Sequence, residues 1–358
     1  MATRVMIMAG GTGGHIFPAL AVGEVLRERG VDVVWMGSPT GLEAELVPAA
    51  GYPVSWVKVS GLRGKGALAW ALAPFKLAWA LSQALGIVFK LRPAAVLGMG
   101  GFVTGPGGVV SWLLRRPLVL HEQNAIPGLT NRLLRPFARR VLTGFPDVFG
   151  GAARAVGNPI RKAIGATPLP DQRLAGRQGR LNLLVLGGSL GAKALNETLP
   201  KALALLPEDI RPKVRHQCGR RTEAETVEAY RSAHVEAQVS SFIEDMADAY
   251  GWADLVVCRA GALTIAELCA AGVASILVPF PHAVDDHQTA NARFLEQVGA
   301  ALLAPQDQLT PERLADWLRE FHGDRERLLG MARAARDQAH PEAARAVADA
   351  CLEVARHG

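Results

Sequence analysis

Two stretches of the chain, VMIMAGGTGG at residues 5–14 and LLVLGGSLG at residues 183–191, share one pattern and decide the fold. Each begins with a short apolar run that is typical of a buried strand, and each continues into a turn rich in glycine. A helical pattern follows in both places, over Ala19 to Arg29 and over Lys193 to Leu206. The repeat therefore predicts two domains that each open with a strand, a glycine turn and a helix.

Apolar runs and helical patterns alternate through both halves, which is typical of α/β domains whose parallel sheets are wrapped by helices. We therefore expect two facing Rossmann-like domains, with the active site in the cleft between the carboxyl ends of their sheets. The turn residues of VGNPIRKAIG (156–165) predict the boundary, so that one domain covers 1–160 and the other 161–340. A final helix over Glu342 to Ala355, within 341–358, could cross back onto the first domain.

The composition excludes several classes of protein. With 49% apolar and 20% charged residues among 358, the chain is globular and long enough for two domains, and it is not a disordered or polytopic membrane protein. Its four cysteines form no CxxC pair, so neither a disulfide framework nor a zinc site is expected. The N-terminus lacks the pattern of a signal peptide, and we expect a cytoplasmic chain.

Basic charge is concentrated in the first half of the chain. Residues 1–160 carry 16 Lys and Arg against 7 Asp and Glu, whereas residues 161–358 carry 23 against 26. Residues 46–121 contain basic side chains but no acidic one, so this surface should attract polyanions. Nucleic acid is not expected, because few stacking aromatics and no binding signature accompany the charge. The other candidate is an anionic lipid surface.

Within this basic tract, GALAWALAPFKLAWALSQALGIVF (66–89) is almost entirely apolar. A proline and Lys76 interrupt it, which leaves too few apolar residues to span a membrane. Two interpretations remain open. The segment is either a buried helix of an α/β domain, or Phe75 and Trp79, with Trp112, form an exposed apolar patch that basic residues surround and that lies in the headgroup region.

The first glycine turn carries a histidine. Gly10 to Gly14 lies between a strand and a helix, where backbone N–H groups face whatever binds at the helix N-terminus. A dinucleotide fingerprint would need glycine in place of Ile16, and a P-loop would need a lysine after the glycines, so neither motif is present. His15 is either a structural residue or a neutral imidazole that takes a proton from a substrate hydroxyl.

The second half contains a more specific motif, LVVCRAGALTIAELCAAG (255–272). A buried strand ends near Cys258, and the helix predicted over Ala262 to Ala271 offers its first N–H groups to phosphate oxygens. Glu267 is either a solvated glutamate or an acceptor for the two hydroxyls of a ribose. Ser189, in the first turn of this domain, either donates to a phosphate or sugar oxygen or caps a helix.

Three smaller groups complete the expected polar lining. HEQN (121–124) follows an apolar strand and should face the cleft from its carboxyl end. The planar guanidinium of Arg161 is suited to a diphosphate because it binds two oxygens at once. Asp285, Asp286 and His287 are adjacent in sequence, and adjacent residues rarely converge on one ion, so we expect no metal and no cofactor.

Nine blocks of sequence between residue 9 and about residue 292 resemble the MurG family of bacterial lipid-intermediate glycosyltransferases, and they occur in the family's order. The resemblance implies a GT-B fold and an inverting transfer of N-acetylglucosamine (GlcNAc) from UDP-GlcNAc. The implied acceptor is the C4 hydroxyl of undecaprenyl-diphospho-N-acetylmuramoyl-pentapeptide (lipid I), and the product is lipid II of peptidoglycan synthesis. The blocks are GGTGGHIFPALAV, SGLRGKG, VLGMGGFVTGP, VLHEQNAIPGLTN, VGNPIR, LGGSLGA, FIEDM, CRAGALTIAEL and PFPHAVDDHQTANA.

The family's functional positions, matched to this sequence, imply roles for particular residues. His15 becomes the general-base candidate, and Glu122 ranks second. Ile243 is expected to read the uracil through its backbone, and Asn124 and Gln288 to contact the GlcNAc. The remaining implied donor contacts are Thr12, Gly13, Gly14, Arg161, Ser189, Ala262, Leu263, Thr264, Ile265, Ala266 and Glu267.

The resemblance also favours the membrane interpretation of the apolar stretch. Phe75, Lys76, Trp79 and Trp112 become a docking site on the inner leaflet, which places the protein peripherally on the cytoplasmic face of the inner membrane. Proteins of cell-wall synthesis are then possible partners. Phe102 departs from the pattern because some members have tyrosine there, so a hydroxyl contact to the acceptor is lost.

Two other classes of function stay open from the residues. A nonhydrolysing UDP-GlcNAc 2-epimerase has the same architecture and donor and would act without a lipid acceptor. A module without enzymatic activity that binds nucleotide sugars or polyanions is the other. The basic, acid-free tract with its apolar stretch fits a lipid acceptor better than either alternative.

Overall fold

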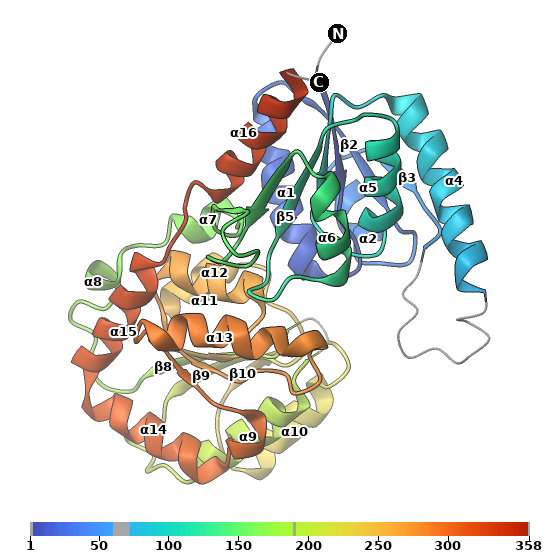
Figure 1. The fold of residues 1–358 in the computed structure, drawn as a ribbon. Coiled ribbons are helices and arrows are strands. Elements are labelled where there is room, and N and C mark those ends of the chain that lie inside the picture. The colour runs from blue at the N-terminus through green and yellow to red at the C-terminus, as the bar shows by residue number, and fades with distance from the viewer. Residues whose placement is uncertain (1–2, 60–71, 189–190, 357–358) are drawn as a thin grey trace. The chain divides into compact units, whose positions relative to one another are not determined.

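The computed structural model describes residues 3–59, 72–188 and 191–356. The chain divides into two compact units (Figure 1). Unit 1 comprises Met1–Arg161 together with Pro341–Gly358, and unit 2 comprises Lys162–His340. Each unit contains a parallel β-sheet with helices packed on it, so the predicted pair of Rossmann-like domains is confirmed.

Among the described residues, unit 1 has a seven-stranded sheet with the strand order β3-β2-β1-β4-β5-β6-β7. The order reverses at β1, because β2 and β3 lie on one side of it and β4 to β7 on the other. In open sheets of this kind, ligands bind beyond the carboxyl ends of the strands at this switch point. The strands are β1 (Arg4–Met8), β2 (Asp32–Gly37), β3 (Val54–Trp56), β4 (Ala95–Gly98), β5 (Leu118–Glu122), β6 (Arg140–Thr143) and β7 (Arg154–Ala155).

Both faces of the unit 1 sheet are covered, because successive side chains of a strand point to opposite faces. Val5 and Ile7 of β1 pack with α1, α2 and α16, whereas Met6 and Met8 pack with α4, α5 and α6. Figure 1 shows α16 beside α1, although the two are far apart in sequence. The helices are α1 (Gly13–Glu28), α2 (Glu43–Ala49), α4 (Ala73–Leu91), α5 (Thr104–Leu113), α6 (Leu129–Leu134), η1 (Arg135–Phe137) and α16 (Ala343–Arg356).

Unit 2 repeats this plan. Its described residues form a six-stranded parallel sheet with the order β10-β9-β8-β11-β12-β13, and the order reverses between β8 and β11. Leu183 and Val185 of β8 pack with α9, α10, α14 and α15 in one apolar core. The strands are β8 (Asn182–Leu186), β9 (Lys213–Gln217), β10 (Gln238–Ser240), β11 (Leu255–Cys258), β12 (Ala274–Leu277) and β13 (Ala301–Leu303).

The helices of unit 2 include one that sequence analysis located to the residue. The helix predicted over Ala262 to Ala271 is α12 (Ala262–Ala271), which packs against α7, α11, α13 and α15. It ends at Gly272, whose left-handed backbone is typical of a helix C-terminus. The other helices are α7 (Lys162–Gly165), α8 (Pro170–Arg173), α9 (Lys193–Ala204), α10 (Glu223–Ser232), α11 (Met246–Trp252), η2 (Val284–Asp286), α13 (His287–Gln297), η3 (Gln306–Gln308), α14 (Pro311–Gly323) and α15 (Arg325–Asp337).

Some predicted element boundaries were wrong, two of them next to predicted site residues. The first helix begins at Gly13 and not at Ala19, because Thr12 is already the extended residue at its N-cap. The strand before HEQN continues through Glu122, since His121 and Glu122 still pair with β6. No helix among the described residues is both long enough and apolar enough to cross a membrane.

Candidate active site

The glycine turn of unit 1 lies at the switch point of its sheet, after the carboxyl end of β1. The buried Glu43 carboxylate accepts hydrogen bonds from the backbone N–H of Gly11 (2.9 Å) and of Ser38 (3.0 Å). A Cβ atom on Gly10 would lie 2.4 Å from a Glu43 carboxylate oxygen, and one on Gly101 would lie 2.4 Å from the Gly10 carbonyl oxygen. Sequence analysis missed Glu43 because an acidic residue at the start of a helix is also typical of ordinary helices.

His15 is the third residue of α1 and is half-buried. Its Nδ1 atom lies 2.9 Å from the Oε1 atom of Gln123, which follows β5. A Cβ atom on Gly100 would lie 2.9 Å from the imidazole, so the bare backbone of the loop after β4 packs against the ring. Thr12 is exposed at the N-cap, and Gly13 and Gly14 open the helix. The predicted residues of this turn are therefore gathered at one helix N-terminus.

Glu122, the second candidate for the base, is buried, and its carboxylate accepts several hydrogen bonds. Its carboxylate accepts hydrogen bonds from the backbone N–H (3.0 Å) and the side-chain amide (3.3 Å) of Asn124. It also accepts from the backbone N–H of Gly128 (3.0 Å) and the side-chain amide of Asn131 (2.8 Å). These bonds connect the end of β5 to the loop that follows it. The role of Glu122 as the second candidate for the base stays a prediction, and Asn124 is part of the loop that its carboxylate contacts.

Arg161 lies at the end of unit 1, where the chain leaves it. The guanidinium carbon of Arg161 is 5.5 Å from the centre of the Phe17 ring on α1. When a guanidinium stacks on an aromatic ring, its N–H groups point outward in the plane of the guanidinium, where they can donate hydrogen bonds to anionic oxygens. The structure thus places Arg161 beside the helix that carries His15.

In unit 2, the loops after β8 and β10 lie at the same edge of the sheet. Gln217, the last residue of β9, accepts a hydrogen bond from the Gly188 N–H (3.0 Å). Its amide donates to the carbonyl oxygens of Gly188 and Ser241 at 3.0 Å each, so it joins the two loops. Gln217 was not among the predicted site residues. Ser189 lies outside the described residues.

Glu267 is on α12, and the interpretation of it as a solvated glutamate is wrong. The side chain is 5% exposed, and its Oε2 atom accepts a hydrogen bond from the hydroxyl of Tyr250 on α11 (3.1 Å). Helix α12 begins after the loop that follows β11, at the switch point of the unit 2 sheet. Ala262, Leu263 and Thr264 form its first turn, with Ile265 and Ala266 behind them, where the helix dipole favours anions.

Gln288, in the first turn of α13, has a fixed side-chain orientation. Its Oε1 atom accepts a hydrogen bond from the backbone N–H of Phe280 (2.9 Å), so the NH2 group of its amide is the end that can bind a ligand.

Asp285 and Asp286, just before Gln288, have left-handed backbones with φ of 54° and 52°. Ile243 is half-buried in the loop between β10 and α11. Within the described parts of the chain, no three His, Cys, Asp or Glu residues are grouped as metal ligands would be.

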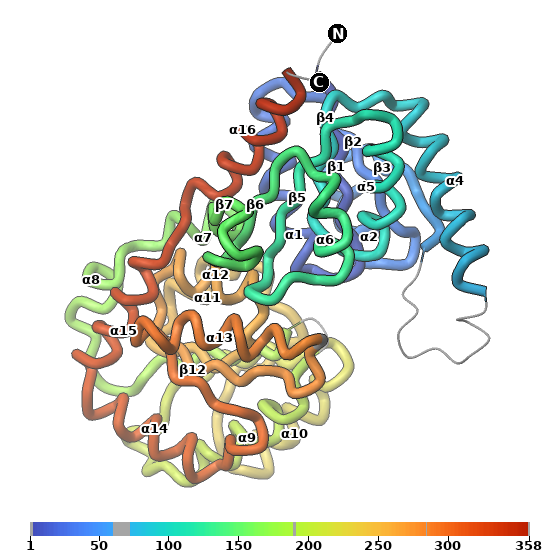
Figure 2. Tube along the Cα trace, viewed as in Figure 1, coloured from blue at the N-terminus to red at the C-terminus, as the bar shows by residue number. Residues whose placement is uncertain are grey.

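The apolar surface of unit 1 is the set of large apolar side chains that are exposed on α4, α5, α6 and η1. Helix α4 buries only its small residues Ala80, Ala84 and Val88, whereas Phe75 is 74% and Trp79 62% exposed. The interpretation as a buried helix is therefore wrong for residues 72–89, and residues 66–71 of the stretch lie outside the described residues. Helix α4 packs beside α5, as Figure 2 shows, and α5 contacts α6. The other exposed members of this apolar surface are Leu77, Leu85, Phe89, Trp112, Leu113, Leu129, Leu133 and Phe137.

Basic side chains accompany the apolar surface. Lys76 is exposed on α4, and Lys90 and Arg92 lie at the end of the same helix. The guanidinium carbon of Arg92 is 5.6 Å from the centre of the exposed Phe89 ring. Trp112 on α5 contacts Phe137 of η1, with their ring centres 4.7 Å apart. Exposed aromatic rings next to cationic groups are typical of proteins that bind an anionic membrane interface.

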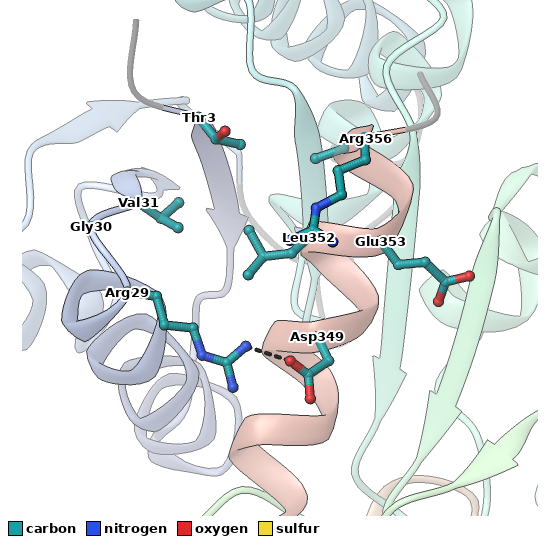
Figure 3. Close-up of a pocket in the computed structure, with 9 residues that line it drawn as sticks. Thr3, Arg29, Gly30, Val31, Asp349, Leu352, Glu353 and Arg356 are labelled. Carbon is teal, nitrogen blue, oxygen red and sulfur yellow. Dashed lines mark hydrogen bonds and ion pairs between the residues drawn. The ribbon is translucent and has the colours of Figure 1, made fainter.

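A separate cavity of about 590 Å³ lies between α16 and the end of α1 (Figure 3). Arg29 forms an ion pair with Asp349 there, and the Glu353 carboxylate pairs with Arg140. Arg29 and Arg140 thus pair with the two carboxylates of the lining, and none of the predicted site residues lines this cavity. It is therefore not a candidate for the donor site.

Comparisons with known proteins agree on one family. Residues 5–143 match the glycosyltransferase family 28 N-terminal domain, and residues 182–347 match the glycosyltransferase family 28 C-terminal domain. A protein of Nitrosococcus oceani, named UDP-N-acetylglucosamine--N-acetylmuramyl-(pentapeptide) pyrophosphoryl-undecaprenol N-acetylglucosamine transferase, is 59% identical over 99% of each chain. A protein of the same name from Alkalilimnicola ehrlichii is 58% identical over 99% of this chain and 100% of its own.

A solved structure agrees with these relatives. The crystal structure of MurG from Acinetobacter baumannii superposes with a TM-score of 0.85 at 42% identity, over 98% of this chain and 99% of that one. The GT-B architecture that the resemblance implied is thereby confirmed.

Proposed function

The chain belongs to the MurG family of N-acetylglucosamine transferases, and on that premise we propose that it transfers GlcNAc from UDP-GlcNAc to the C4 hydroxyl of lipid I, which yields lipid II. The observation that carries this proposal is the identity of 59% to a transferase of that name along the full length of both chains. The transferase names of the relatives do not favour the epimerase alternative.

Unit 2 supplies most of the donor contacts in this proposal, and Asn124 and Arg161 of unit 1 supply the others. Glu267 is a buried carboxylate one and a half turns into α12, and it accepts hydrogen bonds from the two ribose hydroxyls. The first turn of the same helix faces the diphosphate. Ile243 contacts the uracil through its backbone. Gln288 and Asn124 contact the GlcNAc, and the orientation of Gln288 makes it a hydrogen-bond donor to sugar oxygens. Ser189 and Arg161 add contacts to the phosphates.

Unit 1 supplies the base and the acceptor side. His15 removes the proton from the acceptor hydroxyl as that oxygen attacks the anomeric carbon, and the bond to UDP breaks on the opposite face. The GlcNAc configuration is inverted in this single displacement. The leaving UDP gains negative charge, which the N-terminus of α12 and the Arg161 guanidinium stabilise without a tightly held metal. Thr12, Gly13 and Gly14 line the approach to His15.

The membrane contact of the proposal is the apolar surface of α4, α5 and α6. Phe75, Trp79 and Trp112 enter the headgroup region of an anionic leaflet, and Lys76 pairs with its phosphates. This would place the protein peripherally on the cytoplasmic face of the inner membrane, where its lipid acceptor and other proteins of cell-wall synthesis are found.

The decisive experiment is incubation of the full chain with radiolabelled UDP-GlcNAc and a short-chain lipid I analogue, with and without EDTA. Labelled disaccharide lipid should form in both conditions. His15→Ala should lower kcat with little change in UDP affinity. Proton exchange at C2 of UDP-GlcNAc without acceptor would instead indicate the epimerase, and UDP binding without any transfer would indicate a binding module.

A further inference from the structure

The side-chain amide of Gln123 can adopt only one orientation. Gln123 is buried, and its Nε2 atom lies 3.1 Å from the backbone carbonyl oxygen of His121. A carbonyl oxygen only accepts hydrogen bonds, so the group that faces it must be the NH2 group and not the amide oxygen. The amide oxygen therefore faces His15, at 2.9 Å from its Nδ1 atom. Because that oxygen only accepts, Nδ1 of His15 must carry the proton.

His121 stabilises the same orientation from behind. Its ring is fully buried, and its Nε2 atom lies 3.0 Å from the backbone carbonyl oxygen of Gly157, which requires a proton on Nε2. Burial lowers the pKa of His121 to about 4, so the ring is neutral near pH 7 and its Nδ1 atom carries a lone pair. That lone pair accepts the second N–H of the Gln123 amide at 3.1 Å. The backbone carbonyl oxygens of His121 and Gly157 thus determine which group donates and which accepts in each hydrogen bond of this chain.

We propose that Gln123 is a positioning residue for the transfer reaction, which together with His121 keeps His15 in the tautomer that has its proton on Nδ1. The neutral imidazole then has its lone pair on Nε2, the nitrogen that takes the proton of the acceptor hydroxyl. This inference rests on the proposed role of His15 as the general base. Gly157, His121, Gln123 and His15 all belong to unit 1, so the arrangement is complete within that unit.

The test is the ¹⁵N spectrum of the full chain with labelled histidines, recorded through long-range couplings to the ring protons. The signals of His15 are identified by their loss in His15→Gln. The proposal requires His15 protonated on Nδ1 and His121 protonated on Nε2 at neutral pH. A parent protein with His15 protonated on Nε2 would overturn it, whether or not any variant folds.

Gln123→Leu removes the acceptor while nearly keeping the side-chain volume. We expect the His15 proton to move to Nε2 in part or in full, and kcat to fall about 10- to 100-fold, the effect common for residues that orient a functional histidine. The KM for UDP-GlcNAc should stay within about twofold, because the side chain of Gln123 is not among the proposed donor contacts. An unchanged tautomer in this variant would also overturn the proposal.

Asn131→Leu is the matched control. Asn131 is buried at the same strand end, and its amide donates to the His121 carbonyl oxygen (3.3 Å) and the Glu122 carboxylate (2.8 Å) without contacting His15. This variant should be less stable, yet keep the proton of His15 on Nδ1. If Gln123→Leu moves the proton but His15→Ala retains normal turnover, the positioning of His15 is supported while its role as the base is rejected.

Discussion

At the scale of the residue, the site depends on buried polar side chains whose hydrogen-bond partners determine which of their atoms can bind a ligand. Glu43, Gln123 and Glu267 are each at most 5% exposed, and each has hydrogen-bond partners from another element. A buried carboxylate must be compensated, so its remaining acceptor capacity is directed toward a ligand or a backbone N–H. For Glu43 the partner is the glycine turn, and for Glu267 we propose the ribose.

The first prediction concerns Glu267→Gln. The amide keeps one acceptor oxygen but loses the charge, and hydrogen bonds to charged groups contribute about 1.5–3 kcal/mol each. UDP should therefore bind at least about 10-fold more weakly in isothermal titration calorimetry. Tyr250→Phe is the control, because it removes one partner of Glu267 and leaves the carboxylate in place. Parental affinity in Glu267→Gln would rule out contact between this carboxylate and the nucleotide.

At the scale of the element, α4 shows how one helix serves two environments. Alanine and valine at positions 80, 84 and 88 pack on the sheet side, and the aromatic residues at positions 75, 79 and 89 face away from it. The first set is spaced by four residues, and positions 79 and 89 follow position 75 by four and fourteen residues, close to whole numbers of helical turns, so each set lies on one face of the helix. Pro74 is in the first turn, where the absence of its N–H costs nothing. The helix is thus stable as part of unit 1 while it leaves its larger apolar face uncovered.

The second prediction tests this face with the double substitution F75S/W79S. Burial of a large apolar side chain contributes about 1.5–3 kcal/mol, so the loss of two should reduce binding to vesicles of anionic phospholipid more than about 10-fold in co-sedimentation. The unfolding midpoint should hardly change, because both side chains are exposed. Val227→Ser on α10 removes an exposed apolar side chain from unit 2 and should bind vesicles like the parent. Equal binding by F75S/W79S would refute the docking surface.

At the scale of the whole molecule, each unit contains a histidine that burial keeps neutral. Burial lowers the pKa of His121 in unit 1 to about 4 and that of His216 in unit 2 to about 3. His216 lies between the Tyr230 hydroxyl (2.9 Å) and the Asn196 amide oxygen (3.0 Å). In the unfolded chain both rings take up a proton near pH 6.5. Below that pH the unfolded state binds more protons than the folded one, so both units lose stability.

The third prediction follows from this difference. The stabilisation is complete above about pH 6.5. For His121 it is lost progressively down to about pH 4, which amounts to about 3 kcal/mol, and for His216 down to about pH 3, which amounts to about 5 kcal/mol. Calorimetry at pH 7 and pH 5 should show both units unfolding several degrees lower at pH 5, about 2–4 °C for each kcal/mol. His234→Asn, which removes an exposed imidazole, should keep this dependence. A midpoint that rises on acidification would contradict it.

Local patterns in the sequence were sufficient for the fold and for the family. The repeated strand, glycine turn and helix predicted both sheets, and α12 was located to the residue, because apolar periodicity and glycine positions are properties of neighbouring residues. The family blocks likewise required only the order of residues along the chain. These features are read from short stretches and do not depend on what packs against them.

Only the tertiary structure decided which polar side chains form hydrogen bonds with each other and which apolar side chains are exposed. His15 and Gln123 are 108 positions apart, and the burial of Glu43, the occupation of Glu122 and the exposed face of α4 all follow from contacts between distant elements. A hydrogen-bond partner or an exposed fraction is a property of the assembled unit, because the folded chain brings together groups whose separation in sequence carries no signal. The sequence thus determined the scaffold and the chemistry it can carry, and only the packing of the scaffold decided which residues face a ligand.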